Sequence, residues 1–120
     1  TSALSTAHFQ KSGKVLVLAV GSLQRSPSMP EVPTIAESGY PHFEVISWWG
    51  VLGPAAMPKD IVARLNSEIA KVMASPDARD RIAALGADIM TSTPEQFAAY
   101  IKSEQAKWGQ VIKDSGARVD

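Results

Sequence analysis

The sequence predicts an α/β fold with few strands, because short apolar segments alternate with amphipathic helical segments. The expected strands are residues 15–20, 43–52 and 87–90, and helical patterns stand before, between and after them. Strands that alternate with helices imply layers joined by crossover connections. Three strands are few for a self-contained sheet. We therefore expect this chain to be part of a larger fold.

Composition excludes several classes of function. The chain has 120 residues, with twelve acidic and twelve basic side chains, so it has no electrostatic footprint for nucleic acid or an anionic membrane. It has no cysteine, which excludes disulfides, thiolate zinc sites and a cysteine nucleophile. The apolar run at 15–20 is far shorter than the ~20 residues that span a bilayer. The N-terminal residues lack the pattern of a signal peptide and an initiator Met, so we expect the chain to begin within a longer protein.

The first half of the chain contains two expected helices around the first strand. Residues 3–12 predict a short helix that Gly13 ends. The segment 15–20 is β-branched and apolar on both faces, as in a strand buried between layers. After a loop, Thr34 and Glu37 fit a capping box, which predicts a short helix that Gly39 ends.

The second half predicts three helices from their start and stop signals. Pro58 is expected at the first position of a helix over 58–74, whose apolar residues recur at three and four. A second helix runs from Ser75-Pro76-Asp77 to Leu85, with Gly86 as its cap. A second capping box begins at Thr93 and opens a helix that Gly116 ends.

No pattern in the sequence indicates an enzyme, a metal site or a cofactor. His8 and His42 do not stand at metal-ligand spacing, and we interpret both as surface or structural residues. The G-x-S-x-G, G-x-G-x-x-G and P-loop motifs are absent. Most carboxylates start helices or pair with basic residues on what we expect to be solvated helix faces. The pairs are Glu68 with Lys71, Asp77 with Arg81, and Glu104 with Lys107.

Three residues within or just after the first two expected strands are candidates for ligand binding: Ser22, Ser47 and Trp48. Ligands of open α/β sheets lie beyond the carboxyl ends of strands, and Ser22 follows such an end. Its hydroxyl either serves a ligand carboxylate or bonds its own loop, which is the commoner role. Adjacent residues of a strand point to opposite faces, so either Trp48 or Trp49 can face a cleft, unless both indoles only pack.

The stretch from Arg25 to Gly39 has prolines at Pro27, Pro30 and Pro33, the period of a polyproline II helix. One hypothesis makes Pro27 to Pro33 a ligand for a protein-interaction module. However, Arg25 lies in the wrong register for such a ligand, and the stretch runs between a strand and a capped helix. We favour a stiff surface strap. Arg25 then pins the loop by pairing with Glu31 or Glu37, rather than binding an anion.

Taken together, the motifs closely resemble the C-terminal portion of Bug-type receptors, the periplasmic substrate-binding proteins of tripartite tricarboxylate transporters. The matching motifs of the first half are a GK-x-x-x-LAV strand, an R-S-P loop leading to P-x-V-P-T-x-x-E-x-G, and an S-W-x-G-x-x-x-P strand. Those of the second half are an R-L-N helix, an A-L-G-A turn and a T-P-E-x-F helix that ends in K-W. These motifs are residues 13–20, 25–39, 47–54, 64–66, 84–87 and 93–108. The resemblance covers nearly the whole chain in one order.

This resemblance implies part of a two-lobed, type II periplasmic-binding-protein fold in the α/β class. By analogy, residues 1–45 belong to the second lobe and residues 46–120 complete the first, with a hinge near 45–48. Arg25, Thr34 and Glu37 then have structural roles near the hinge. The family implies a small carboxylate or dicarboxylate ligand, membrane transporter subunits as partners of the full receptor, and a periplasmic location. For this chain we expect pairing with an N-terminal portion, or self-association.

Overall fold

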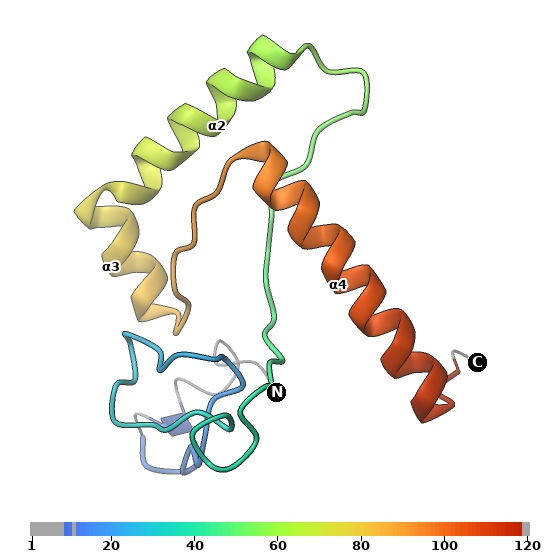
Figure 1. The fold of residues 1–120 in the computed structure, drawn as a ribbon. Coiled ribbons are helices and arrows are strands. Elements are labelled where there is room, and N and C mark those ends of the chain that lie inside the picture. Colours follow the sequence, from blue (N-terminus) through green and yellow to red (C-terminus); the bar gives the residue numbers. More distant parts are fainter. Residues whose placement is uncertain (1–8, 11, 119–120) are drawn as a thin grey trace. The chain divides into compact units, whose positions relative to one another are not determined.

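The computed structural model describes residues 9–10 and 12–118, and in this part of the chain it contains three helices besides the short helical piece at residues 9 and 10 (Figure 1). They are α2, Lys59–Ala74, α3, Pro76–Ala84, and α4, Pro94–Ser115. The chain forms two compact units. One consists of Thr1–Gly53 with Lys71–Met90, and the other of Pro54–Ala70 with Thr91–Asp120. In the described part of the chain, no helix combines the length and the hydropathy of a membrane-spanning segment.

Helix α2 begins one residue later than the sequence predicts. The carbonyl oxygen of Pro58 accepts the first helical hydrogen bond, from the N–H of Val62 at 3.1 Å, so Pro58 precedes the helix instead of occupying its first position. The expected apolar stripe is only partly covered. Val62 and Ile69 are half-buried, whereas Leu65 is 47% exposed and Val72 is 60% exposed.

The predicted caps of the last two helices are confirmed. The Ser75 hydroxyl accepts a hydrogen bond from the N–H of Ala78 and starts α3, which Gly86 follows with a φ of +75°. In α4 the Thr93 hydroxyl accepts from the N–H of Gln96, and the Gln96 side chain accepts from the N–H of Thr93. Gly116 ends this helix in the left-handed conformation that favours glycine.

The expected strands at 15–20, 43–52 and 87–90 are wrong for the described part of the chain. It contains one isolated parallel bridge, between Val20 and Thr34, and otherwise these segments are extended without a ladder. A strand needs a neighbouring strand along its length, and the segment 15–20 meets another backbone only at its end. Leu16 and Leu18 are consequently 83% and 75% exposed.

The helix expected after Thr34 is also wrong, because the chain forms a turn there. The N–H of Ser38 donates to the Ile35 carbonyl at 3.1 Å, and Gly39, with a φ of +112°, ends the turn at once. The first expected helix, 3–12, lies mostly outside the described residues, as does His8. Its described residues 9 and 10 are helical, and Gly13 closes them with an N–H bond to the carbonyl of Gln10.

One expectation about α4 is corrected by burial. The sequence predicts Glu104 on a solvated face with Lys107, but Glu104 is only 6% exposed. The carboxylate forms an ion pair with Lys107 and accepts a hydrogen bond from Trp108 Nε1 at 3.0 Å. Lys107 also lies over the Trp108 ring, 5.6 Å from its centre. By contrast, the expected Asp77–Arg81 pair is exposed, as predicted.

Candidate functional site

The candidate site lies where the segment 15–20 ends and residues 22–33, here called the proline loop, begin. Val20 pairs with the backbone on one side, through its N–H to Pro33 and its carbonyl to Ile35, each at 2.9 Å. The Gly21 carbonyl then accepts from the N–H of Val45 at 2.8 Å. The loop therefore starts at a point where three backbone segments meet.

Gly21 is required for this close approach. A Cβ atom at this position would lie 2.3 Å from the Val45 carbonyl oxygen, which is far inside contact distance and belongs to backbone. Ser22 follows directly, and its hydroxyl donates to the Gln24 carbonyl at 2.6 Å. This local bond is the commoner of the two roles that the sequence allows. It uses the one hydroxyl hydrogen and leaves both lone pairs of the oxygen able to accept.

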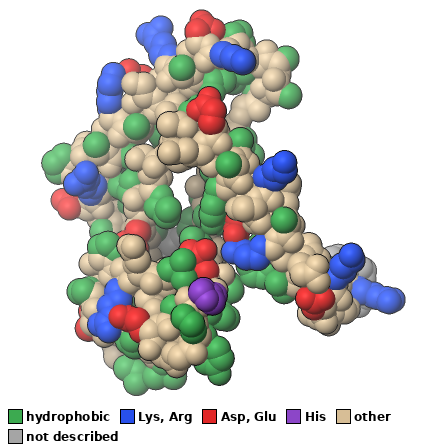
Figure 2. All heavy atoms as spheres, viewed as in Figure 1, with side chains coloured by type: hydrophobic (Ala, Val, Ile, Leu, Met, Phe, Trp, Pro, Cys, Tyr) green, Lys and Arg blue, Asp and Glu red, His purple; other side chains and the backbone are tan. Residues whose placement is uncertain are grey.

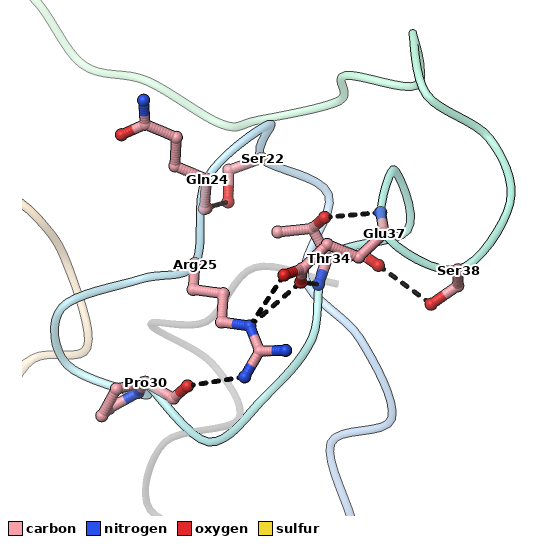
Figure 3. Close-up of polar contacts among 7 residues, drawn as sticks. All are labelled: Ser22, Gln24, Arg25, Pro30, Thr34, Glu37 and Ser38. Carbon is pink, nitrogen blue, oxygen red and sulfur yellow. Dashed lines mark hydrogen bonds and ion pairs between the residues drawn. The ribbon is translucent and has the colours of Figure 1, made fainter.

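Arg25 closes the proline loop (Figure 3). Its Nε donates to both carboxylate oxygens of Glu37, at 3.1 and 3.0 Å, and its Nη1 donates to the Pro30 carbonyl at 3.1 Å. Of the two partners that the sequence allowed, Glu37 is the one found. Arg25 thus pins the loop, as the strap interpretation predicts.

Glu37 in turn belongs to the predicted capping box, whose two hydrogen bonds are present (Figure 3). Its carboxylate accepts from the N–H of Thr34 at 2.7 Å, and its own N–H donates to the Thr34 hydroxyl at 3.0 Å. Thr34 is fully buried, and its carbonyl accepts from the Ser38 hydroxyl. The Thr34 N–H, followed by Arg25, holds the pKa of Glu37 below its ordinary value, because both favour the charged carboxylate.

The prolines do not form a polyproline II helix. Two turns close within the loop, with the N–H of Met29 bonded to the Ser26 carbonyl at 3.0 Å and the N–H of Val32 bonded to the Met29 carbonyl at 3.1 Å. A polyproline II segment has no internal hydrogen bonds. Val32 is also buried, with 5% of its surface exposed. A segment that is turned and anchored in this way is unsuited to docking as an extended ligand, so the structure favours the strap.

A second anchor of the loop was not visible in the sequence. The Ser26 hydroxyl donates to Asp88 Oδ2 at 2.7 Å, and the Ser28 hydroxyl lies 2.7 Å from the Ser26 oxygen. Asp88 follows α3 and stands 62 residues beyond Ser26. No local spacing rule connects residues so far apart, so only the fold reveals the contact.

Ser47 and Trp48 lie on the segment that continues from Val45, the residue bonded to Gly21. Ser47 is exposed, and Trp48 is 38% exposed whereas Trp49 is 69% exposed. The two indoles therefore differ in their surroundings, as expected for neighbours that point in opposite directions. His42 is exposed, in accordance with a surface role. The assignment of Ser22, Ser47 and Trp48 to a ligand site stays a prediction.

Charges of both signs are mixed on the face of the molecule that Figure 2 draws. Figure 2 shows acidic and basic side chains interspersed over the visible face, without a field of one sign. Within the described residues no group of three or more His, Asp or Glu side chains is placed to hold a metal ion.

Comparisons with known proteins give a consistent picture. A family model described as the tripartite tricarboxylate transporter family receptor matches residues 1–117. A UPF0065 protein from the tcbD-tcbE intergenic region of Pseudomonas sp. strain P51 is 45% identical over 82% of this chain, and BugT of Bordetella pertussis is 35% identical over 91%. The chain spans about a third of these two relatives, 30% and 33% of their lengths.

Solved structures agree with the sequence relatives. R. palustris Rpa4515 with adipate has a TM-score of 0.79 at 30% identity over 95% of this chain, and the periplasmic binding protein BugD has 0.74 at 36% over 92%. MatC (Rpa3494) from Rhodopseudomonas palustris with bound malate has 0.70 at 31% over 92%. The chain covers 38% of each of these structures. They confirm the predicted fold class, part of a periplasmic-binding-protein fold of the α/β type, although the individual strands are not formed in the described residues.

Proposed function

Because this chain belongs to the tripartite tricarboxylate transporter receptor family, we propose that it serves as part of an extracytoplasmic solute receptor for a small carboxylate or dicarboxylate. The family match over residues 1–117 carries this proposal. Two similar structures support the ligand class, since Rpa4515 was solved with adipate and MatC with bound malate, both dicarboxylates. The location we propose is the periplasm, as for BugD, and the role is binding rather than catalysis.

In this proposal the junction at Gly21 and Val45 presents the ligand-binding residues. Ser22 offers a hydroxyl oxygen and a backbone N–H where the extended segment ends, and Ser47 and Trp48 lie on the neighbouring segment. The Ser22 backbone N–H and the Ser47 hydroxyl suit a carboxylate as donors, and the Ser22 hydroxyl becomes a further donor once its bond to the Gln24 carbonyl opens. An indole covers the aliphatic part of such a ligand. Arg25, Thr34 and Glu37 act structurally, by fixing the loop that follows Ser22.

The partners of the chain follow from its share of the fold. We propose that residues 1–45 belong to one lobe and residues 46–120 to the other, with the remainder of each lobe supplied by the part of the receptor that the chain does not span. The exposed apolar residues of the extended segments support this, because they are expected to pack in a complete sheet. When the rest of the receptor is absent, we propose that self-association of the chain covers these apolar residues. The complete receptor delivers its ligand to the membrane subunits of the transporter.

The proposal can be tested in a chimera in which this chain replaces the matching 38% of Rpa4515. Thermal denaturation is followed with adipate, malate, citrate and the neutral control 1,6-hexanediol, and unmodified Rpa4515 serves as the positive control. Ligand at about 100 times its Kd stabilises a receptor by roughly 2.7 kcal/mol, which is a readily measured rise in Tm. We expect a rise with at least one acid and none with the diol. A folded chimera that no acid stabilises would contradict the proposal.

A further inference from the structure

We propose that Asp88 is a positioning residue, which holds the proline loop through Ser26 and thereby sets the place of Ser22 in the ligand site. The first part of this inference concerns the chain alone, and the second part rests on the function proposed above. Asp88 lies outside every motif that the sequence analysis singled out as functional.

The contact is a directed chain of hydrogen bonds that ends on a charge. The single hydroxyl hydrogen of Ser26 is given to Asp88 Oδ2, so the 2.7 Å contact between the two serine oxygens is donated by Ser28. The N–H of Ser28 also donates to the Ser26 oxygen, at 3.2 Å. The Ser26 hydroxyl therefore donates one hydrogen bond and accepts two from Ser28. Because the carboxylate of Asp88 can only accept, it fixes the direction of all these bonds. Asp88 is exposed, so water competes for this bond, and we expect it to contribute as one ordinary hydrogen bond.

Asp88 anchors the loop on a stretch of chain different from the one that Arg25 uses. Arg25 bonds to Glu37 and Pro30, both within the first stretch of the unit, Thr1–Gly53. Asp88 belongs to the second stretch, Lys71–Met90, which the chain reaches only after passing through the other unit. The Ser26–Asp88 bond thus ties the loop to the segment after α3 within one compact unit, and under the lobe division proposed above it joins residues of the two lobes.

The route from this anchor to the candidate site is short. Ser26 is four residues from Ser22, whose hydroxyl bonds to the Gln24 carbonyl, and Arg25 between them is held by Glu37. Ser26 also begins the first turn of the loop, because its carbonyl accepts from the N–H of Met29. The bonds that hold Arg25 are made by its guanidinium, so the loop backbone can still shift when the Asp88 anchor is lost, and this shift changes the position of Ser22.

Hydrogen exchange on the 120-residue chain tests the anchor without any ligand. Asp88→Ala is expected to speed exchange of the Met29 amide about fivefold, the effect of losing one ordinary hydrogen bond. Asp88→Asn keeps an acceptor oxygen and should restore most of the protection. Asp80→Ala, which removes an exposed carboxylate on α3, is the matched control and should leave the loop unchanged. Ser26→Ala combined with Asp88→Ala should be no faster than Ser26→Ala alone. Unchanged exchange in Asp88→Ala would overturn the inference.

Adipate titration of the chimera tests the second part. We expect Asp88→Ala to raise the Kd about fivefold, as the same lost bond would, and Asp88→Asn to change it less than twofold. If Asp88→Ala loosens the loop but leaves the Kd unchanged, the positioning role is overturned. If the unsubstituted chimera does not bind adipate, the proposed function fails and takes the ligand role of Asp88 with it. The exchange experiment still decides whether Asp88 holds the loop.

Discussion

Arg25 Nε lies 3.1 and 3.0 Å from the two carboxylate oxygens of Glu37, and this pair closes the proline loop. Both side chains are 46% exposed, so water and salt weaken their attraction, and exposed ion pairs contribute little to stability. The value of the contact is geometric. One guanidinium fixes both the Glu37 carboxylate and the Pro30 carbonyl, and so sets the path of the chain between Ser22 and Thr34.

The first prediction concerns the pKa of Glu37, which should lie below its ordinary value of 4.5. Because the Thr34 N–H is the larger cause and Arg25 the next, Arg25→Ala should raise this pKa only part of the way. The pKa is lowered in the folded state, so the contribution of Glu37 to stability is present above pH 4.5 and is lost as the pH falls through the folded-state pKa.

Titration of the Glu37 carboxyl carbon by NMR measures this effect. Glu95 is an internal control, because its pKa is also lowered, through hydrogen bonds from its own N–H and from Thr93, with no contribution from Arg25. The titration of Glu95 should be the same in the unsubstituted chain and in the Arg25→Ala variant. An Arg25→Ala variant in which Glu37 titrates fully at its ordinary value would show that the capping bond is not the larger cause.

A second prediction compares two glycines. Gly21→Ala should destabilise the chain by about 1–3 kcal/mol, because the new methyl group meets the Val45 carbonyl at 2.3 Å and the backbone must move. Gly109→Ala is the matched control. It lies within α4 with nothing within 4 Å of its Cβ position, so it should stabilise the helix by about 0.5–1 kcal/mol. Urea unfolding followed by circular dichroism measures both. Equal effects of the two substitutions would contradict the close approach at Gly21.

A third prediction concerns the buried carboxylate of α4. Glu104→Ala should lower the free energy of unfolding by about 1–3 kcal/mol, because the Trp108 N–H loses its acceptor. Glu104→Gln keeps an acceptor for Trp108 and should cost less. Gln105→Ala, on the exposed neighbouring position, is the control. The midpoint of urea unfolding should be lowest for Glu104→Ala, higher for Glu104→Gln and nearly unchanged for Gln105→Ala, without a change of m-value. Similar midpoints for the Glu104→Ala and Gln105→Ala variants would show that burial of Glu104 has no energetic role.

A fourth prediction concerns the state of the isolated chain. Several large apolar side chains of the extended segments are more than two thirds exposed, which favours association. They are Leu16, Leu18, Trp49, Val51, Leu52 and Met90. We expect light scattering to show oligomers. We also expect weak or no carboxylate binding, because in the proposed receptor the ligand site needs residues that this chain does not contain. A soluble monomer that binds a carboxylate with micromolar affinity would contradict this expectation.

The features that the sequence predicted well are local ones. The capping boxes at Thr34 and Thr93 and the glycines after α3 and α4 depend on residues within one turn of each other, and all of them are found. The start of α2 differs from the prediction by one residue, because proline is compatible both with the last residue before a helix and with its first residue. Local signals also have a limit, since the Thr34 box caps a turn and not a helix.

The features that failed depend on distant partners. An apolar β-branched run such as 15–20 indicates a strand only if neighbouring strands are present, and the described chain supplies a bridge at Val20 alone. The solvated face predicted for Glu104 is wrong because an i,i+3 pair with Lys107 is compatible with either a solvated or a buried face. The bond from Ser26 to Asp88 joins residues 62 apart, for which the sequence offers no rule.

Calorimetric titration of adipate into the chimera of this chain with Rpa4515 tests the central claim most directly. If the chain is part of a carboxylate receptor, the heat should follow a saturable isotherm with one site, and Ser22→Ala should weaken it. The neutral 1,6-hexanediol should give no binding heat. A folded chimera that gives no saturable heat with adipate, under conditions in which unmodified Rpa4515 binds it, would contradict the claim.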